Sequence, residues 1–124
     1  MNHFDRPLSP HLQVYKPQLT SLLSILHRAT GVASFLGSLC LLVWLVALAW
    51  DASLYGFVQP IALSFYVQII IFFWSLSLTY HLCNGIRHLA WDAGFGYELE
   101  EVYKGGYIVL AASLLITLLI WLTK

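Results

Sequence analysis

Three long stretches without a charged side chain dominate this sequence, and short polar segments separate them. The stretches run over residues 29–50, 52–86 and 105–123. Each is long enough to cross the hydrocarbon core of a bilayer, which takes about 20 helical residues. Because lipid offers no hydrogen bonds to bare backbone groups, such segments cross as helices rather than as open strands. The pattern therefore predicts an all-α membrane protein with three transmembrane helices.

The predicted helices cover about 22–50, 61–90 and 104–123, and Pro60 marks the expected start of the second helix. Residues 1–21 are polar and contain three of the four prolines, so they are predicted to form an N-terminal segment outside the bilayer. Residues 22–124 are predicted to form a single three-helix membrane anchor.

Composition agrees with a lipid environment. Hydrophobic residues make up 60% of the chain, charged residues make up 10%, and the mean hydropathy is +0.77. A soluble domain of 124 residues could not hide that much apolar surface, because small domains bury only part of what the chain exposes. The six basic and six acidic residues balance, so the composition predicts contact with membrane lipid and no nucleic-acid partner.

The distribution of basic residues predicts the orientation of the helices. Five of the six precede the first predicted helix, lie near its start, or flank the segment between the second and third, namely Arg6, Lys16, Arg28, Arg87 and Lys104. Because basic residues concentrate on the cytoplasmic side, the N-terminus and residues 92–104 are predicted to face the cytoplasm, or the matrix in a mitochondrion. Residues 51–60 and the C-terminus are predicted to face the other side.

His81 is a polar side chain well inside the second predicted helix, where its placement costs free energy. It precedes His88 by about 10 Å of helix. Ser77, His81, Gly85 and His88 share one stripe of that helix. A neutral imidazole is a good axial ligand for haem iron, and Gly85 leaves room for a flat macrocycle. The spacing is equally compatible with a histidine hydrogen-bonded to a neighbouring helix.

Ser24, His27 and Arg28 form a second polar group near the start of the first predicted helix. Arg28 is a permanent cation suited to carboxylates such as haem propionates, and His27 adds a donor beside it. Ser24 lies one turn before Arg28 on the same face, so the two could bind a quinone carbonyl. The alternative is an anchor in which these side chains reach to the membrane surface.

Small residues form one side of the first predicted helix, at Gly31, Ser34, Gly37 and Ser38. Small side chains let two helices approach closely or leave space for a flat cofactor, and packing is the simpler interpretation. The aromatic run Phe72, Phe73 and Trp74 carries no specific functional signal and fits either lipid-facing or core positions.

Two motifs in this order resemble those of the cytochrome b large anchor subunits of succinate dehydrogenase, respiratory complex II. The first comprises Arg6-Pro7-Leu8-Ser9-Pro10-His11-Leu12, then Leu19, Ser24 and His27-Arg28-Ala29-Thr30-Gly31. The second comprises His81, Gly85-Ile86-Arg87-His88-Leu89, Trp91-Asp92 and Gly94. With the three predicted helices, the resemblance covers nearly the whole chain, and neither motif departs from the family pattern.

The resemblance assigns a role to each polar residue singled out above. His81 matches the axial ligand to the iron of haem b. His27 and Arg28 match residues near the haem propionates, and Ser24 and Arg28 match residues that line the ubiquinone site. The expected cofactor is therefore one haem b, with ubiquinone as the substrate.

The same resemblance implies a complex around this chain. In such complexes succinate is oxidised at a flavin in a soluble flavoprotein subunit. Electrons then cross an iron–sulfur subunit and reduce quinone where that subunit meets two membrane anchors. The chain is thus expected to be a subunit of succinate:quinone oxidoreductase outside the catalytic head, in a bacterial or mitochondrial inner membrane. No G-x-G-x-x-G motif or cysteine cluster in this sequence would itself supply flavin or iron–sulfur chemistry.

A second small membrane subunit is expected to supply the other axial haem ligand. An electron-transfer haem b is expected to have two axial imidazoles, and only His81 lies well inside a predicted helix. His88 shares the helical stripe of His81, so the two cannot approach iron from opposite sides. His3 and His11 belong to the polar N-terminal segment. His27 is the only plausible partner ligand within this chain, but its neighbour Arg28 and the family resemblance both point it toward the propionates. The anchor is therefore predicted to form part of a heteromeric haem-binding helical bundle.

Two other functions compete with this one. The chain could be a structural membrane anchor that docks a dehydrogenase without holding haem, although the intramembrane His81 argues against that. It could also be a small membrane subunit in which His81 relays protons. The third predicted helix has only Ser113 and Thr117 as internal polar residues, which disfavours a polar pathway.

Overall fold

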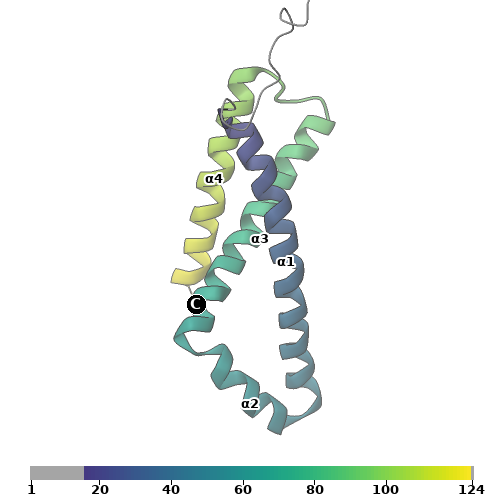
Figure 1. Cartoon of the computed structure of the whole chain (residues 1–124), viewed down its shortest axis with the longest axis vertical. Coiled ribbons are helices and arrows are strands. Elements are labelled where there is room, and N and C mark those ends of the chain that lie inside the picture. The colour runs from purple at the N-terminus through teal and green to yellow at the C-terminus, as the bar shows by residue number, and fades with distance from the viewer. Residues whose placement is uncertain (1–15, 124) are drawn as a thin grey trace, which may run out of the picture.

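The computed structural model describes residues 16–123, and within that range it contains four helices and no strand (Figure 1). They are α1 (Leu19–Trp50), α2 (Ala52–Ala62), α3 (Phe65–Asp92) and α4 (Leu99–Leu122). Three of them, α1, α3 and α4, are long and apolar enough to cross a membrane. The predicted all-α architecture with three membrane-spanning helices is thus confirmed. The N-terminal motif at residues 6–12 lies outside the described residues.

The helix α2 corrects the prediction of a loop over 51–60 and of a second helix starting near Pro60. Asp51 caps α2, because its carboxylate accepts hydrogen bonds from the backbone N–H of Ser53 at 2.8 Å and from the Ser53 hydroxyl. These bonds hold the pKa of the Asp51 carboxyl below its ordinary value, and the bond from the Ser53 backbone N–H has the largest effect. Pro60 lies inside α2, and the break comes instead at Leu63 and Ser64, directly before α3.

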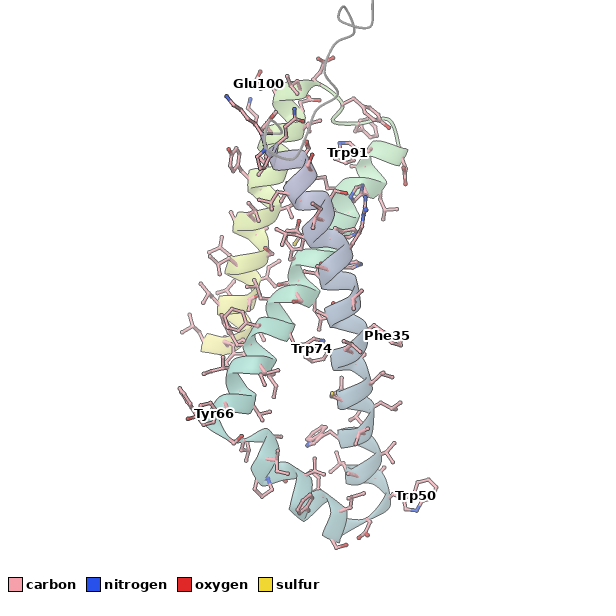
Figure 2. The ribbon with its side chains drawn as sticks, viewed as in Figure 1. Phe35, Trp50, Tyr66, Trp74, Trp91 and Glu100 are labelled. Carbon is pink, nitrogen blue, oxygen red and sulfur yellow. The ribbon has the colours of Figure 1, made fainter. Side chains whose placement is uncertain are left out.

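Few side chains are buried among the described residues 16–123, and the buried ones are as often polar as apolar. The buried apolar residues are Leu23, Ala47, Tyr80 and Val109, and the buried polar residues are Thr79, Asn84, Ser113 and Thr117. Large apolar side chains such as Phe35 and Trp50 point outward along the bundle (Figure 2). This distribution is inverted relative to a soluble protein, and it suits a surface solvated by lipid.

A seam of hydroxyl groups joins α3 to α4. The hydroxyls of Thr79 and Thr117 lie 2.7 Å apart, and Thr79 also lies 3.2 Å from the carbonyl oxygen of Ser113. Further along, the Trp121 indole N–H donates to the Ser75 hydroxyl at 2.9 Å. Hydrogen bonds of this kind hold helices together in lipid, where apolar contact alone gives little preference for helix over lipid.

The α1–α3 contact is close because glycine in α1 leaves room for tryptophan in α3. A Cβ atom on Gly37 would collide with the pyrrole ring of Trp74, whose indole N–H donates to the carbonyl oxygen of Ser34 at 3.3 Å. Figure 2 shows Trp74 between the two helices. The small-residue side of α1 thus serves helix packing, as interpreted, and at Ser34 and Gly37 the side chain that packs against it is Trp74.

The start of α1 lies against both other spanning helices. The Tyr80 hydroxyl donates to the carbonyl oxygen of Leu23 at 2.9 Å, which ties α1 to α3. Gly106 in α4 packs against the Leu23 side chain so closely that a Cβ there would come within 2.8 Å of it. The first turns of α1 therefore sit beside the end of α3 and the start of α4, where the predicted site residues lie.

Candidate functional site

His81 lies on the side of α3 that faces α1. Its Nδ1 atom is 3.1 Å from the backbone carbonyl oxygen of His27 and 3.4 Å from the Thr30 hydroxyl oxygen. Within the described residues, Nε2 of His81 has no hydrogen-bond partner. The Nδ1 edge of the imidazole is therefore held by α1, and the Nε2 atom remains available to bind another group.

The imidazoles of three histidines form a row at this contact. The rings of His27 and His81 are stacked, with centroids 4.0 Å apart and an angle of 8° between their planes. The His88 ring follows, tilted, with its centroid 5.2 Å from that of His27. The structure thus brings His27 directly against the predicted ligand, which the spacing of residues in the sequence did not reveal.

The three imidazoles do not by themselves make a metal site. Within residues 16–123 no group of three or more His, Cys, Asp or Glu side chains is arranged to hold a metal ion. In a stacked pair the ring faces meet, whereas an imidazole binds iron through the in-plane lone pair of a ring nitrogen. The stack therefore covers a face of His81 and leaves the lone pair of Nε2 available.

The space around His81 differs between its two sides. A Cβ on Gly31 of α1 would lie 3.1 Å from Cε1 of His81, so α1 approaches the ring more closely than a residue with a side chain would readily allow. One turn after His81 in α3, a Cβ on Gly85 would meet nothing within 4 Å. A single imidazole with one held edge, beside an open glycine on the same helix, fits the needs of a haem iron ligand.

Ser24 and Arg28 lie together on α1, as their spacing predicted. The Arg28 guanidinium donates to the Ser24 hydroxyl over a long distance of 3.4 Å, and Arg28 is exposed. An open hollow of about 360 Å³ lies over them, lined by Thr20, Ser21, Ser24, Ile25 and Arg28. It offers one fixed cation and several hydroxyl groups next to apolar surface, a combination that suits the carbonyl of a quinone head group.

Arg87 and Trp91, both part of the second motif, form a further cluster, for which the sequence alone predicts no role in the site. The Arg87 guanidinium lies 4.1 Å from the Trp91 ring centroid and donates to the backbone carbonyl oxygen of Val102 at 2.8 Å. It also reaches the amide oxygen of Asn84, which is fully buried, at 3.4 Å. The rings of Trp91 and His88 lie nearly perpendicular, with centroids 5.0 Å apart. The cluster thus joins the end of α3 and the start of α4 to the histidine row.

The turn between α3 and α4 is ordered by backbone conformation and by Trp91. Gly94 and Gly96 adopt positive φ angles of 90° and 80°, which other residues rarely tolerate. The Trp91 indole N–H donates to the carbonyl oxygen of Gly96 at 2.9 Å, and the Tyr97 hydroxyl donates to the carbonyl oxygen of Trp91. The pair of nearby glycines in the sequence is the signal that could have predicted this turn.

Comparison with known proteins gives a consistent result along nearly the whole chain. Residues 2–120 match the family model described as succinate dehydrogenase/fumarate reductase transmembrane subunit. The chain is 46% identical over 116 residues to the succinate dehydrogenase cytochrome b556 subunit of Rickettsia prowazekii, covering 94% of this chain and 90% of that protein.

Relatives from other lineages show similar coverage. The cytochrome b560 subunit of Marchantia polymorpha succinate dehydrogenase is 43% identical over 122 residues, which cover 93% of this chain and 88% of that protein. The cytochrome b556 subunit of Paracoccus denitrificans succinate dehydrogenase is 37% identical over 119 residues, covering 96% and 92%. The similarity therefore extends over all three spanning helices.

Proposed function

Because the chain belongs to the succinate dehydrogenase/fumarate reductase transmembrane subunit family, we propose that it binds haem b and helps to form the site of ubiquinone reduction. As a cytochrome b membrane subunit it is part of an enzyme complex, and the chemistry of succinate oxidation belongs to other chains. Its own contribution is to place redox groups and quinone at defined positions in the membrane.

The observation that carries the haem assignment is the environment of His81. Two oxygen atoms of α1 face Nδ1, which leaves Nε2 for the iron. Gly85 provides open space one turn away. A bound haem b would supply one-electron transfer there. His81 is therefore proposed as the axial ligand contributed by this chain.

His27 and Arg28 are proposed to hold the haem propionates. Both lie near the start of α1, and the ring of His27 is stacked on that of His81, so His27 is within reach of a group bound by His81. Arg28 supplies a permanent positive charge at the membrane boundary, where two carboxylates need compensation.

Ser24 and Arg28 are proposed to bind ubiquinone at the hollow on α1. The Ser24 hydroxyl can donate to a quinone carbonyl, and the Arg28 guanidinium can stabilise the negative charge that develops as the quinone accepts electrons. Arg28 would then serve both groups, so its loss affects haem and quinone together.

The same family membership supports a proposal for the assembly and its location. The chain is proposed to pair with a second small membrane subunit that supplies the other haem ligand. It is also proposed to dock an iron–sulfur subunit and, through that, a flavoprotein. The proposed location is a bacterial or mitochondrial inner membrane, with the start of α1 and the α3–α4 turn on the cytoplasmic or matrix side.

Reduced-minus-oxidised absorption spectra of the purified complex test the haem assignment. His81→Leu should abolish or strongly alter the low-spin haem signal. His88→Leu, on the same face of α3 but one ring removed from His81, is the matched control and should keep it. A normal haem signal in the His81→Leu complex would exclude His81 as the ligand and favour a purely structural anchor.

A further inference from the structure

Thr30 is placed between the backbone of α1 and the imidazole of His81. Its hydroxyl group lies 2.8 Å from the carbonyl oxygen of Leu26 and 3.0 Å from that of His27, both in its own helix. The same hydroxyl oxygen lies 3.4 Å from Nδ1 of His81. Thr30 therefore contacts the edge of the imidazole opposite the one proposed to bind iron.

The donor and acceptor roles at this contact follow from counting protons. A threonine hydroxyl has one proton, and the two short contacts to backbone carbonyls use it, because a carbonyl can only accept. Toward His81 the Thr30 oxygen must then act as an acceptor. The carbonyl oxygen of His27, 3.1 Å from the same Nδ1, is also an acceptor. Two acceptors facing one ring nitrogen require that Nδ1 carry the proton, which leaves the lone pair on Nε2.

Gly31, the next residue, fixes the position of the same ring sterically. A methyl group at Gly31 would come within 3.1 Å of Cε1 of His81, closer than ordinary van der Waals contact between carbon atoms at about 3.5–4.0 Å. Gly31 thus lies against the Cε1 and Nδ1 edge of the ring. Thr30 and the His27 carbonyl hold Nδ1, and Gly31 sets how closely the ring can approach α1.

We infer that Thr30 and Gly31 are positioning residues for the haem ligand: Thr30 gives the Nδ1–H of His81 a second acceptor beside the His27 carbonyl and so raises the electron-donating strength of the imidazole, and Gly31 fixes the orientation of its ring. The inference rests on the proposed role of His81 as the axial ligand. A second hydrogen-bond acceptor at the free N–H of a ligating histidine raises the basicity of the ligand, and a more basic ligand favours the oxidised metal. Thr30 therefore lowers the midpoint potential of the haem.

The two residues call for different substitutions and have close controls. Thr30→Val keeps the shape of the side chain and removes the oxygen, while Thr30→Ser restores it. Thr123→Val is the matched control, because the Thr123 hydroxyl likewise bonds two carbonyls of its own helix, those of Leu119 and Ile120, but faces no histidine. For Gly31→Ala the control is Gly56→Ala, whose added Cβ meets nothing within 4 Å.

The measurements are the midpoint potential and the electron paramagnetic resonance g-values of the haem in the assembled complex, alongside haem content. Thr30→Val should raise the potential, and Thr30→Ser and Thr123→Val should leave it near the starting value. Gly31→Ala should shift the g-values by rotating the ligand ring, with little change in Gly56→Ala. If Thr30→Val prevents haem retention altogether, Thr30→Ser must recover it for the inference to stand.

The outcomes separate this inference from the proposed function. An unchanged potential in Thr30→Val, in a complex where His81→Leu does destroy the haem signal, would overturn the role of Thr30 while preserving His81 as the ligand. A haem signal that survives His81→Leu would remove the basis of both. Equal shifts in Thr30→Val and Thr30→Ser would show that the hydroxyl oxygen is not responsible, and would also overturn the inference.

Discussion

Replacing Gly37 by alanine should separate α1 from α3, because the new methyl group would occupy the position of the Trp74 pyrrole ring. Small-to-large substitutions in a packed interior cost about 1–3 kcal/mol. Trp74 cannot move aside without losing its hydrogen bond to the carbonyl oxygen of Ser34, and an interhelical bond in lipid contributes about 0.6 kcal/mol on average. The expected destabilisation is therefore about 2–4 kcal/mol, which changes the unfolding equilibrium roughly 30-fold or more.

The assay is unfolding of the detergent-solubilised complex by a denaturing detergent, followed by circular dichroism. Gly37→Ala should unfold at a clearly lower denaturant fraction than the parent, and Gly56→Ala in α2 should not, because its added methyl group meets no neighbour. Trp74→Ala removes all the ring atoms that would collide, so Gly37→Ala should cost much less in a Trp74→Ala chain than in the parent. If Gly37→Ala proves as harmless as Gly56→Ala, the close packing of α1 on α3 is refuted.

Three further predictions follow from the site and the topology. Arg28→Leu should depress quinone reduction while sparing succinate-dependent reduction of a soluble dye, and equal loss of both in an assembled complex would contradict the quinone role. Single cysteines placed at Ser53 and Gly96, in a chain lacking its native cysteines, should react with impermeant reagents from opposite sides of the membrane; labelling from one side only would exclude three spans. Because the pKa of Asp51 is lowered in the folded state, its capping of α2 should be fully present above the ordinary carboxyl pKa, about 3.9, and be lost as the pH falls through the lower folded value. Circular dichroism of the parent and Asp51→Ala should converge at that acid pH, and a constant difference between them would contradict the capping role.

The spanning helices could be predicted from the sequence because membrane thickness imposes a length that apolar runs reveal directly. The same use of apolar runs could not separate α2 from α3. Residues 52–86 form one charge-free run, and nothing in hydropathy marks the break at Leu63 and Ser64. The local signal for the start of α2 is Asp51 two residues before Ser53. This is a helix-capping pattern, which a hydropathy profile does not detect. Pro60 predicts a helix start, where prolines are common, but it lies within α2.

The candidate site shows a similar division. His81, His27, Arg28 and Ser24 could be selected from the sequence, because polar groups are rare in lipid and their spacing along one helix is fixed. Contacts between helices could not. The stacking of His27 on His81 and the approach of Thr30 to the same ring depend on how α1 crosses α3. That crossing depends on the fit of Trp74 against Gly37. The pattern of small residues in α1 indicates a close contact but does not identify Trp74 as the residue that packs there.

The hydroxyl seam between α3 and α4 has a consequence for the opposite face of α3. Apolar side chains slide past one another in lipid with little change in free energy, but turning α3 by one residue, about 100°, would point the Thr79 hydroxyl away from Thr117 and Ser113. His81 follows Thr79 by two residues, so it projects to nearly the other side of the helix. The seam therefore restricts rotation of α3 about its own axis. Hydrogen bonds formed with α4, on the far side of α3, therefore act together with the contact of Trp74 and Gly37 to hold the imidazole of His81 toward α1.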